Sequence, residues 1–157
     1  MKNKKFYTLE EAKRKFESYC VYQERCHAEI ESKLYEMYLS SKEKEEVILH
    51  LLEHDFLNEE RFSKSYARGK FYIKKWGKDR IVRELKHRKI TSYNITKALL
   101  EIDEDEYLAT FNELAEKKNA QLTETDIQKR RKKLIDYLRY RGWESHLVYD
   151  KVLELTS

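Results

Sequence analysis

The chain contains no proline and only three glycines among its 157 residues, and this restricts the folds open to it. β-Sandwiches and barrels need many tight turns, and tight turns use glycine and proline. Apolar residues instead recur three and four positions apart along nearly the whole chain, which is the spacing of amphipathic helices. No segment of strand length shows a convincing alternation of apolar and polar residues. The sequence therefore predicts an all-α protein.

One arrangement of apolar and capping residues occurs three times. Two apolar residues four positions apart are followed five positions later by a third, and a helix with a polar N-cap begins there. The three copies are Ile30, Leu34, Leu39 and Ser40; Ile81, Leu85, Ile90 and Thr91; and Leu134, Leu138, Trp143 and Glu144–Ser145. This repeat predicts three tandem three-helix units of the helix-turn-helix kind, over residues 1–57 (with a short N-terminal tail), 58–102 and 103–157.

Positive charge is concentrated in the second unit. The whole chain carries +4, but residues 61–90 hold twelve Lys or Arg against two acids, a net +10 that leaves −6 elsewhere. A further basic segment, residues 129–141, carries +6. Like charges at this density repel unless an anion neutralises them, and nucleic acid supplies regularly spaced phosphates. Two alternatives to nucleic-acid binding stay open: the basic residues could form a solvated face, or they could contact an acidic protein surface.

The helix that Asn58 is expected to cap separates apolar from basic residues. Four apolar or small positions form a stripe expected to be buried: Phe62, Tyr66, Gly69 and Ile73. Four bases cluster within about 60° of one another on the flank away from this stripe. They are Arg61, Lys64, Arg68 and Lys75. Phe71 is expected to project among the bases, where an exposed ring can stack on an unpaired nucleobase.

Trp76 and Gly77 follow this helix directly. Gly77 is expected to join it to the next helix, because glycine adopts a positive φ without steric cost. Trp76 is more typical of an anchor between helices than of a stacking platform. The pair therefore predicts a sharp turn inside the basic segment.

Several short motifs in the second unit, and a few in the first, match one known pattern. Those of the second unit are Leu57-Asn58-Glu59-Glu60-Arg61-Phe62, Tyr66-Ala67-Arg68-Gly69-Lys70, Lys75-Trp76-Gly77-Lys78-Asp79-Arg80-Ile81 and Glu84-Leu85. Those of the first are Tyr19-Cys20, Arg25-Cys26-His27, Glu29-Ile30 and Lys33-Leu34. With these motifs the chain resembles the RecX family, bacterial regulators of the RecA recombinase. The resemblance extends over residues 8–155 and is weakest in the third unit. Lys78 departs from the small residue or proline usual after the Trp-Gly pair.

The resemblance implies a function as well as a fold. Tandem three-helix repeats would form an elongated, curved molecule that binds the RecA–DNA filament along its groove. It would limit filament growth, strand exchange, ATP hydrolysis and co-protease activity, and so modulate recombinational repair and the SOS response, without being an enzyme or using a cofactor. The residues expected to contact the filament or DNA are Arg61, Lys64, Arg68, Lys70, Phe71, Lys74, Lys75, Trp76, Lys78, Arg80, Arg83 and Lys86. Binding to single- and double-stranded DNA is expected to be weak and salt-dependent.

Metal and redox chemistry find little support in the sequence. His50 and His54 fit the H-x-x-E-H pattern of inverted zinc peptidases. Apolar residues occupy the same helix side, however, and no third ligand is assigned, so no metal site is expected. Cys20 and Cys26 lack the spacing of a zinc set and are expected to be buried free thiols. A zinc-peptidase role stays the weakest alternative.

Targeting signals are not visible either. No 18-residue apolar run occurs, and the basic start, Met1–Lys5, is not followed by the apolar region of a secretory signal. A monomer in the cytoplasm, away from membranes, is expected. The main rival function is a helix-turn-helix protein that acts on DNA directly. Its recognition helices would lie near residues 92–100 and 145–155, and neither is basic.

Overall fold

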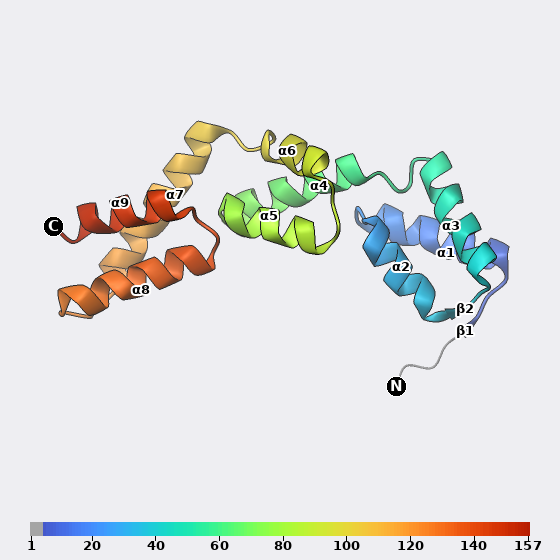
Figure 1. The fold of residues 1–157 in the computed structure, drawn as a ribbon, viewed down its shortest axis with the longest axis horizontal. Helices are drawn as coiled ribbons and strands as arrows, with labels where there is room; N and C mark the ends of the chain where they lie inside the picture. Colours follow the sequence, from blue (N-terminus) through green and yellow to red (C-terminus); the bar gives the residue numbers. More distant parts are fainter. Residues whose placement is uncertain (1–4) are drawn as a thin grey trace.

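The computed structural model describes residues 5–157, and within them almost all regular structure is helical (Figure 1). The helices of the first unit are α1 (Leu9–Tyr22), α2 (His27–Tyr35) and α3 (Ser41–Glu53). Those of the second are α4 (Glu59–Arg68), α5 (Lys78–His87) and α6 (Ser92–Leu99), with one π-helical turn, η1 (Gly69–Ile73), continuing α4. Those of the third are α7 (Glu104–Gln121), α8 (Ile127–Tyr140) and α9 (Ser145–Leu155). The prediction of an all-α fold built from tandem three-helix repeats is confirmed.

The three sets of helices follow one another along an elongated, curved molecule (Figure 1). In the second unit, α5 lies on the inner, concave edge of the arch and α6 on the outer edge. Most of the expected N-terminal tail, residues 1–4, lies outside the described residues. None of the helices in the described part is both long and apolar enough to cross a membrane.

Side-chain caps begin α3, α4 and α6 at the places where the sequence predicts them, whereas Glu144, at the N-cap of α9, makes no side-chain cap bond. Thr8 accepts a hydrogen bond from the Glu11 amide, and Ser40 forms a reciprocal capping box with Glu43. The side chain of Asn58 accepts from the Arg61 amide at the start of α4, and that of Thr91 accepts from the Asn94 amide at the start of α6. These caps satisfy amide groups that a helix N-terminus otherwise leaves without a partner.

The buried residues form two clusters. One lies within the first unit and includes Phe16, Ile30 and Leu51. The other lies mainly in the second and third units, where Leu85 and Trp143 belong to the same core, and it also includes Cys26 of the first unit. The second and third units are therefore joined by apolar packing, whereas the first has a core of its own and contributes Cys26 to the shared one.

A short strand pair was not expected from the sequence. β1 (Lys5–Phe6) runs parallel to β2 (Met37–Tyr38), and the rings of Phe6 and Tyr38 stack with their centroids 4.4 Å apart. Two residues are too few to produce a period-two pattern that could be read from a sequence. The pair ties the start of the described chain to the end of α2.

The buried face of α4 differs from the predicted stripe. Phe62 is buried, but Ile73 is 77% exposed, and the face turned to the core carries Ser63, Ala67 and Phe71. The Ser63 hydroxyl donates to the Glu59 carbonyl at 2.7 Å and so needs no other partner. Small side chains at Ser63 and Ala67 let α4 pack closely against α6. The prediction was wrong here because it continued an α-helical stripe to Ile73, where the chain forms a π-helical turn, and because it left out Ser63 and Ala67.

A cation–aromatic ladder as candidate binding surface

The segment between α4 and α5 turns back on itself in three steps. The π-helical turn η1 widens the end of α4, and Lys75 then adopts a left-handed conformation with φ 59°. The amide of Trp76 donates to the Lys70 carbonyl at 3.0 Å. This turn folds the Trp76 indole back toward the side chains of α4 and η1, and its ring centroid lies 6.4 Å from that of Tyr66.

Cations and aromatic rings alternate along the resulting surface. The Arg88 guanidinium lies 4.9 Å from the centroid of Tyr66. The Lys70 ammonium lies between two rings, 5.3 Å from Tyr66 and 4.8 Å from Trp76. The Arg80 guanidinium also lies near two, 4.0 Å from Trp76 and 5.1 Å from Tyr140 of α8. We call these six residues the cation–aromatic ladder: Arg88, Tyr66, Lys70, Trp76, Arg80 and Tyr140.

The ladder holds positive charge that is not neutralised. Within residues 5–157, no carboxylate lies at ion-pair distance from Lys70 or Arg80, whereas Arg88 pairs with Glu84 at 3.1 Å. Partial burial, and then the charges of Lys74, Arg88 and Arg80, lower the pKa of Lys70. Ring faces orient the cations without cancelling their charge. The surface is therefore prepared for an anion from outside the chain.

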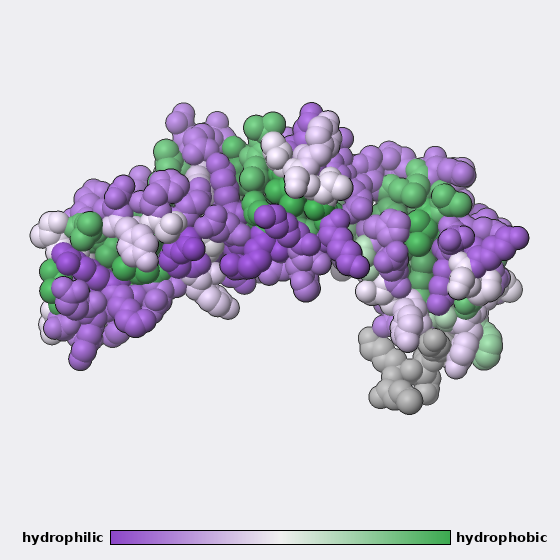
Figure 2. Space-filling view, in the orientation of Figure 1, coloured by the Kyte–Doolittle hydropathy of each residue, from purple (hydrophilic) through white to green (hydrophobic). Residues whose placement is uncertain are grey.

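More unpaired bases continue along α5. Arg83 and Lys86, and Lys89 just beyond the helix, are exposed, and none has a carboxylate partner among the described residues. Figure 2 shows strongly hydrophilic residues gathered over α5, on the concave side of the molecule. The ladder and these bases together give the second unit its uncompensated charge.

Several of the predicted contact residues are engaged within the protein instead. Arg61 donates to Glu24 and Asp55, Lys64 lies 3.5 Å from Glu60, Arg68 pairs with Glu101, and Lys78 lies 2.8 Å from Glu104. Of the other predicted residues, Lys70, Trp76 and Arg80 belong to the ladder, while Lys74, Lys75, Arg83 and Lys86 are exposed near it. The structure thus separates structural bases from available ones, a distinction that charge counting cannot make.

The expectation for Phe71 was wrong. Its ring is 1% exposed and packs against Tyr107 at 5.5 Å and Trp143 at 6.4 Å between centroids. Phe71 comes four positions after Ala67 and so reaches the same buried face of the helix. It belongs to the core shared by the second and third units and cannot stack on a nucleobase.

The expectation of a positive φ at Gly77 was also wrong. Gly77 has φ −77° and serves as the N-cap of α5, while Lys75 supplies the left-handed turn. Its amide donates to the Arg141 carbonyl at 2.9 Å, and the Asp79 amide donates to the Gly142 carbonyl at 3.0 Å. Gly77 is required because the third unit approaches its backbone directly.

Three members of the ladder were not predicted from the sequence as binding residues: Tyr66, Arg88 and Tyr140. Tyr66 and Lys70 are four positions apart on one helix face, a spacing that could have indicated their contact. Arg88 was counted as a base, but nothing in the sequence places it over Tyr66. Tyr140 comes from the third unit, and only the docking of α8 beside α5 brings it to Arg80.

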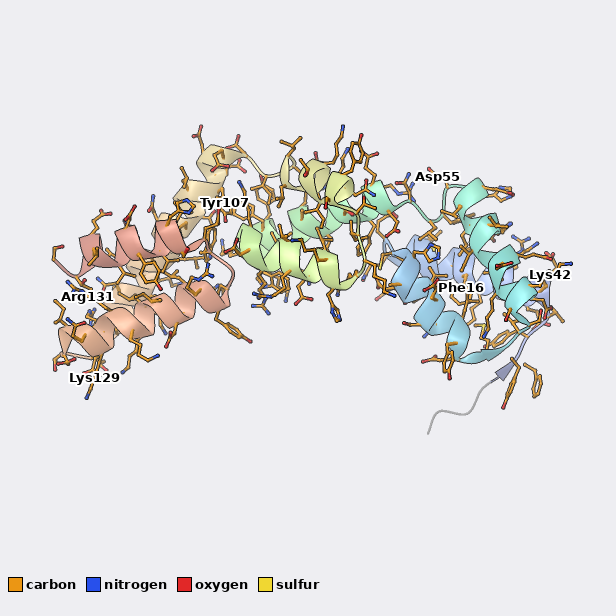
Figure 3. All side chains as sticks on the ribbon, in the orientation of Figure 1. Phe16, Lys42, Asp55, Tyr107, Lys129 and Arg131 are labelled. Atoms are coloured by element: carbon orange, nitrogen blue, oxygen red, sulfur yellow. The ribbon has the colours of Figure 1, made fainter. Side chains whose placement is uncertain are left out.

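Tyr107 holds the third unit against the ladder. Its hydroxyl accepts from the Lys78 amide at 2.8 Å and donates to the Glu144 carboxylate, which stands at the N-cap of α9. Its ring lies 4.6 Å from that of Trp143, and burial, followed by the bond to Glu144, raises the pKa of Tyr107. Figure 3 labels Tyr107 where α7 faces the second unit. These contacts position Tyr140 relative to Arg80.

The basic segment of the third unit is mostly engaged within the protein. Arg130 donates to the carbonyls of Asn119, Leu122 and Glu124, and Arg131 donates to Thr156. Lys132 and Lys133 pair with Asp136 and Glu124. Lys129 and Arg131 also lie at the far end of the molecule from the second unit (Figure 3). This segment therefore adds little free charge to the ladder.

The histidine pair and the cysteines are accounted for by packing. His50 hydrogen-bonds Glu17 of α1 at 2.6 Å, and its ring lies 4.5 Å from that of His54. The described residues contain no cluster of three or more side chains suited to a metal ion. Cys20 and Cys26 are both buried and free, as predicted.

Comparisons with known proteins agree with the fold. Sequence models of the second and third three-helix domains of RecX match residues 58–99 and 104–152. A crystal structure of RecX from Lactobacillus salivarius is 21% identical, with a TM-score of 0.78 over 94% of this chain and 96% of that one. A crystal structure of the regulatory protein RecX is also 21% identical, with a TM-score of 0.77 over 92% of this chain and 74% of that one. A comparison with curated proteins gave no significant match. Because the two domain models together match more than half of its residues, the chain belongs to the RecX family.

Proposed function

We propose that this chain is a non-enzymatic regulator that binds the RecA–DNA filament and inhibits its recombinase, ATPase and co-protease activities. It acts in recombinational DNA repair and the SOS response, in the cytoplasm, as a monomer that needs no cofactor. Membership in the RecX family supports RecA as the partner. The observation that carries the proposal is the cation–aromatic ladder, an un-neutralised surface on the second unit of a curved molecule.

The ladder suits a nucleoprotein filament for physical reasons. Such a filament presents DNA phosphates and acidic protein side chains along a groove, and an elongated arch can follow that groove. Cations already held over aromatic rings lose little conformational freedom when they bind, which favours affinity. Each base that contacts a phosphate also releases counterions, so binding to DNA alone is expected to weaken as salt is added.

A variant that lacks the two unpaired cations of the ladder, Lys70 and Arg80, tests this proposal. The double variant Lys70→Gln and Arg80→Gln is expected to bind RecA–single-stranded-DNA filaments more weakly. For binding to DNA alone, the slope of log affinity against log salt concentration is expected to become shallower by roughly two, one for each lost phosphate contact. The matched control, Lys132→Gln with Lys133→Gln, removes the same charge from bases that already have carboxylate partners. Equal effects of the two double variants would show that net charge, and not the ladder, determines binding.

The rival function, direct action on DNA as a helix-turn-helix protein, finds less support in the charges. The candidate recognition helices are α6 and α9, and bases are sparse on both. On α9, Lys151 is 7% exposed and pairs with Glu116 and Glu154. Tight binding to one duplex sequence, with no effect on RecA, would favour this rival.

A further inference from the structure

An open groove lies where the first unit meets the second. One wall is the loop after α1, with Gln23 and Glu24, and the other is formed by α4 and η1. The groove has a volume of about 260 Å³, and Phe62, Tyr66, Gly69 and Ile73 supply much of its lining. The ammonium groups of Lys70 and Lys74 come from the same wall. The groove thus shares Tyr66 and Lys70 with the ladder but adds apolar lining of its own.

Gly69 is not explained by the fold. Its φ is −63°, an ordinary helical value, and a Cβ added there would meet nothing within 4 Å. Glycine inside a helix destabilises it relative to alanine, so neither conformation nor packing favours glycine here. The π-helical turn begins at this residue, and such turns are frequent at functional sites. The missing side chain keeps the groove open.

The groove combines apolar surface with positive charge. Ile73 is 77% exposed, and the half-buried Tyr66 adds aromatic area beside it, whereas Phe62 is only 4% exposed. Lys70 and Lys74 have no carboxylate partner among the described residues. The acid in the lining, Glu24, already receives a hydrogen bond from Arg61. An occupant would therefore be apolar at its centre and negatively charged at its edge.

These features favour a protein over a nucleic acid. Cations occupy positions near the Tyr66 ring, Arg88 at 4.9 Å and Lys70 at 5.3 Å, so a nucleobase would have to displace them to stack there. An exposed aliphatic side chain offers nothing to a phosphate, and interfaces with DNA are polar and strongly basic. Apolar centres with polar rims are instead typical of protein–protein interfaces.

We propose that this groove binds an apolar side chain of a protein partner that is flanked by a carboxylate, with Ile73 and Gly69 at the apolar contact and Lys70 and Lys74 facing the carboxylate. The proposal deepens the proposed function and rests on it in taking the RecA filament as that partner. Because the groove has walls from the first and second units, its occupant contacts both. It would fix their relative position on the filament.

Two variants of the full chain test the groove without removing a charged residue. Gly69→Leu fills the groove from a position with open space, and Ile73→Asp places a like charge against the expected carboxylate. Each is expected to weaken binding to RecA–single-stranded-DNA filaments by about tenfold or more, the size of a central interface contact. The matched control is Leu100→Asp, since Leu100 is 76% exposed in the same unit but does not line the groove. It is expected to change binding less than about twofold, within the range of a peripheral contact.

Binding to naked single-stranded DNA is measured in parallel, with helical circular dichroism as a check on folding. Weaker filament binding by both groove variants with unchanged DNA binding supports the proposal. An equal loss on naked DNA shows that nucleic acid occupies the groove and overturns it. Full filament binding by both variants also overturns it, while leaving the proposed function intact. If the unaltered chain does not bind the filament, the proposed function is refuted instead. The RecA filament would then also be excluded as the occupant of the groove.

Discussion

Gly77 and Gly142 meet backbone to backbone where the second unit joins the third. A Cβ added to Gly77 would lie 2.3 Å from the Gly142 carbonyl oxygen, and one added to Gly142 would lie 2.2 Å from the Cβ of Arg80. Gly142 also has φ +95°, a value that favours glycine. The two glycines thus permit the approach that brings Tyr140 to Arg80 and completes the ladder.

Substitution of Gly77 by alanine is expected to destabilise this junction strongly. The new methyl group would meet backbone, which cannot rotate away, so we expect the free energy of unfolding to fall by about 3 kcal/mol, the upper part of the range for overpacking. Urea unfolding followed by circular dichroism measures the change. Gly69→Ala is the control, expected to stabilise the chain by about 0.5–1 kcal/mol because its Cβ would meet open space. Similar losses in both variants would contradict the close approach.

Tyr107 should make stability depend on pH in the alkaline range. Burial, followed by the bond to Glu144, raises the pKa of Tyr107 above its unfolded value of about 10. Its contribution is therefore full below pH 10 and is lost as the pH rises beyond that, because only the unfolded state then releases the proton. Tyr107→Phe is expected to cost about 1–3 kcal/mol at neutral pH, since the partly buried Lys78 amide and Glu144 carboxylate lose their hydrogen bonds to the hydroxyl. The variant should also lose less stability than the unaltered chain between pH 9 and pH 11.

Tyr149→Phe provides the control for this measurement, because Tyr149 is 51% exposed on α9. It should leave the neutral stability unchanged. An alkaline slope that is the same in all three proteins would exclude Tyr107 as its source.

The two cysteines can report on the two cores separately. Cys20 belongs to the core of the first unit and Cys26 to the core shared by the others. Burial raises the pKa of both thiols to about 11 and also restricts access to them, so at pH 8 alkylation should be much slower in the folded state than in the unfolded chain. In urea, single-cysteine variants should show Cys20 reacting first, because the smaller core buries less surface. Simultaneous exposure of both thiols would show that the three units unfold together.

The indole of Trp76 should matter to binding although it carries no charge. Trp76→Leu keeps the net charge but removes the ring near Lys70 and Arg80, so we expect roughly three- to tenfold weaker filament binding, about 0.6–1.4 kcal/mol. Tyr93→Leu is the control, because Lys97 lies 5.4 Å from the Tyr93 ring on α6, outside the ladder. Unchanged binding by the Trp76 variant would mean that the cations act without their aromatic supports.

The sequence predicted features that depend on near neighbours and missed those that depend on distant ones. Apolar spacing and caps such as Ser40 and Thr91 located the helices, because a helix face and an N-cap involve residues only a few positions apart. The burial of Phe71 and the role of Gly77 follow from the docking of the third unit, which no local pattern encodes. Likewise, the charge of the second unit was visible, but the pairing of Arg68 with Glu101 was not.

The most direct measurement is the single-stranded-DNA-dependent ATPase activity of RecA with this chain titrated into it. Our account predicts inhibition at near-stoichiometric or lower ratios to RecA. It also predicts that the double variant Lys70→Gln and Arg80→Gln needs a higher concentration for the same effect, whereas Lys132→Gln with Lys133→Gln does not. Undiminished ATPase activity at near-stoichiometric amounts of the folded, unaltered chain would contradict the central claim.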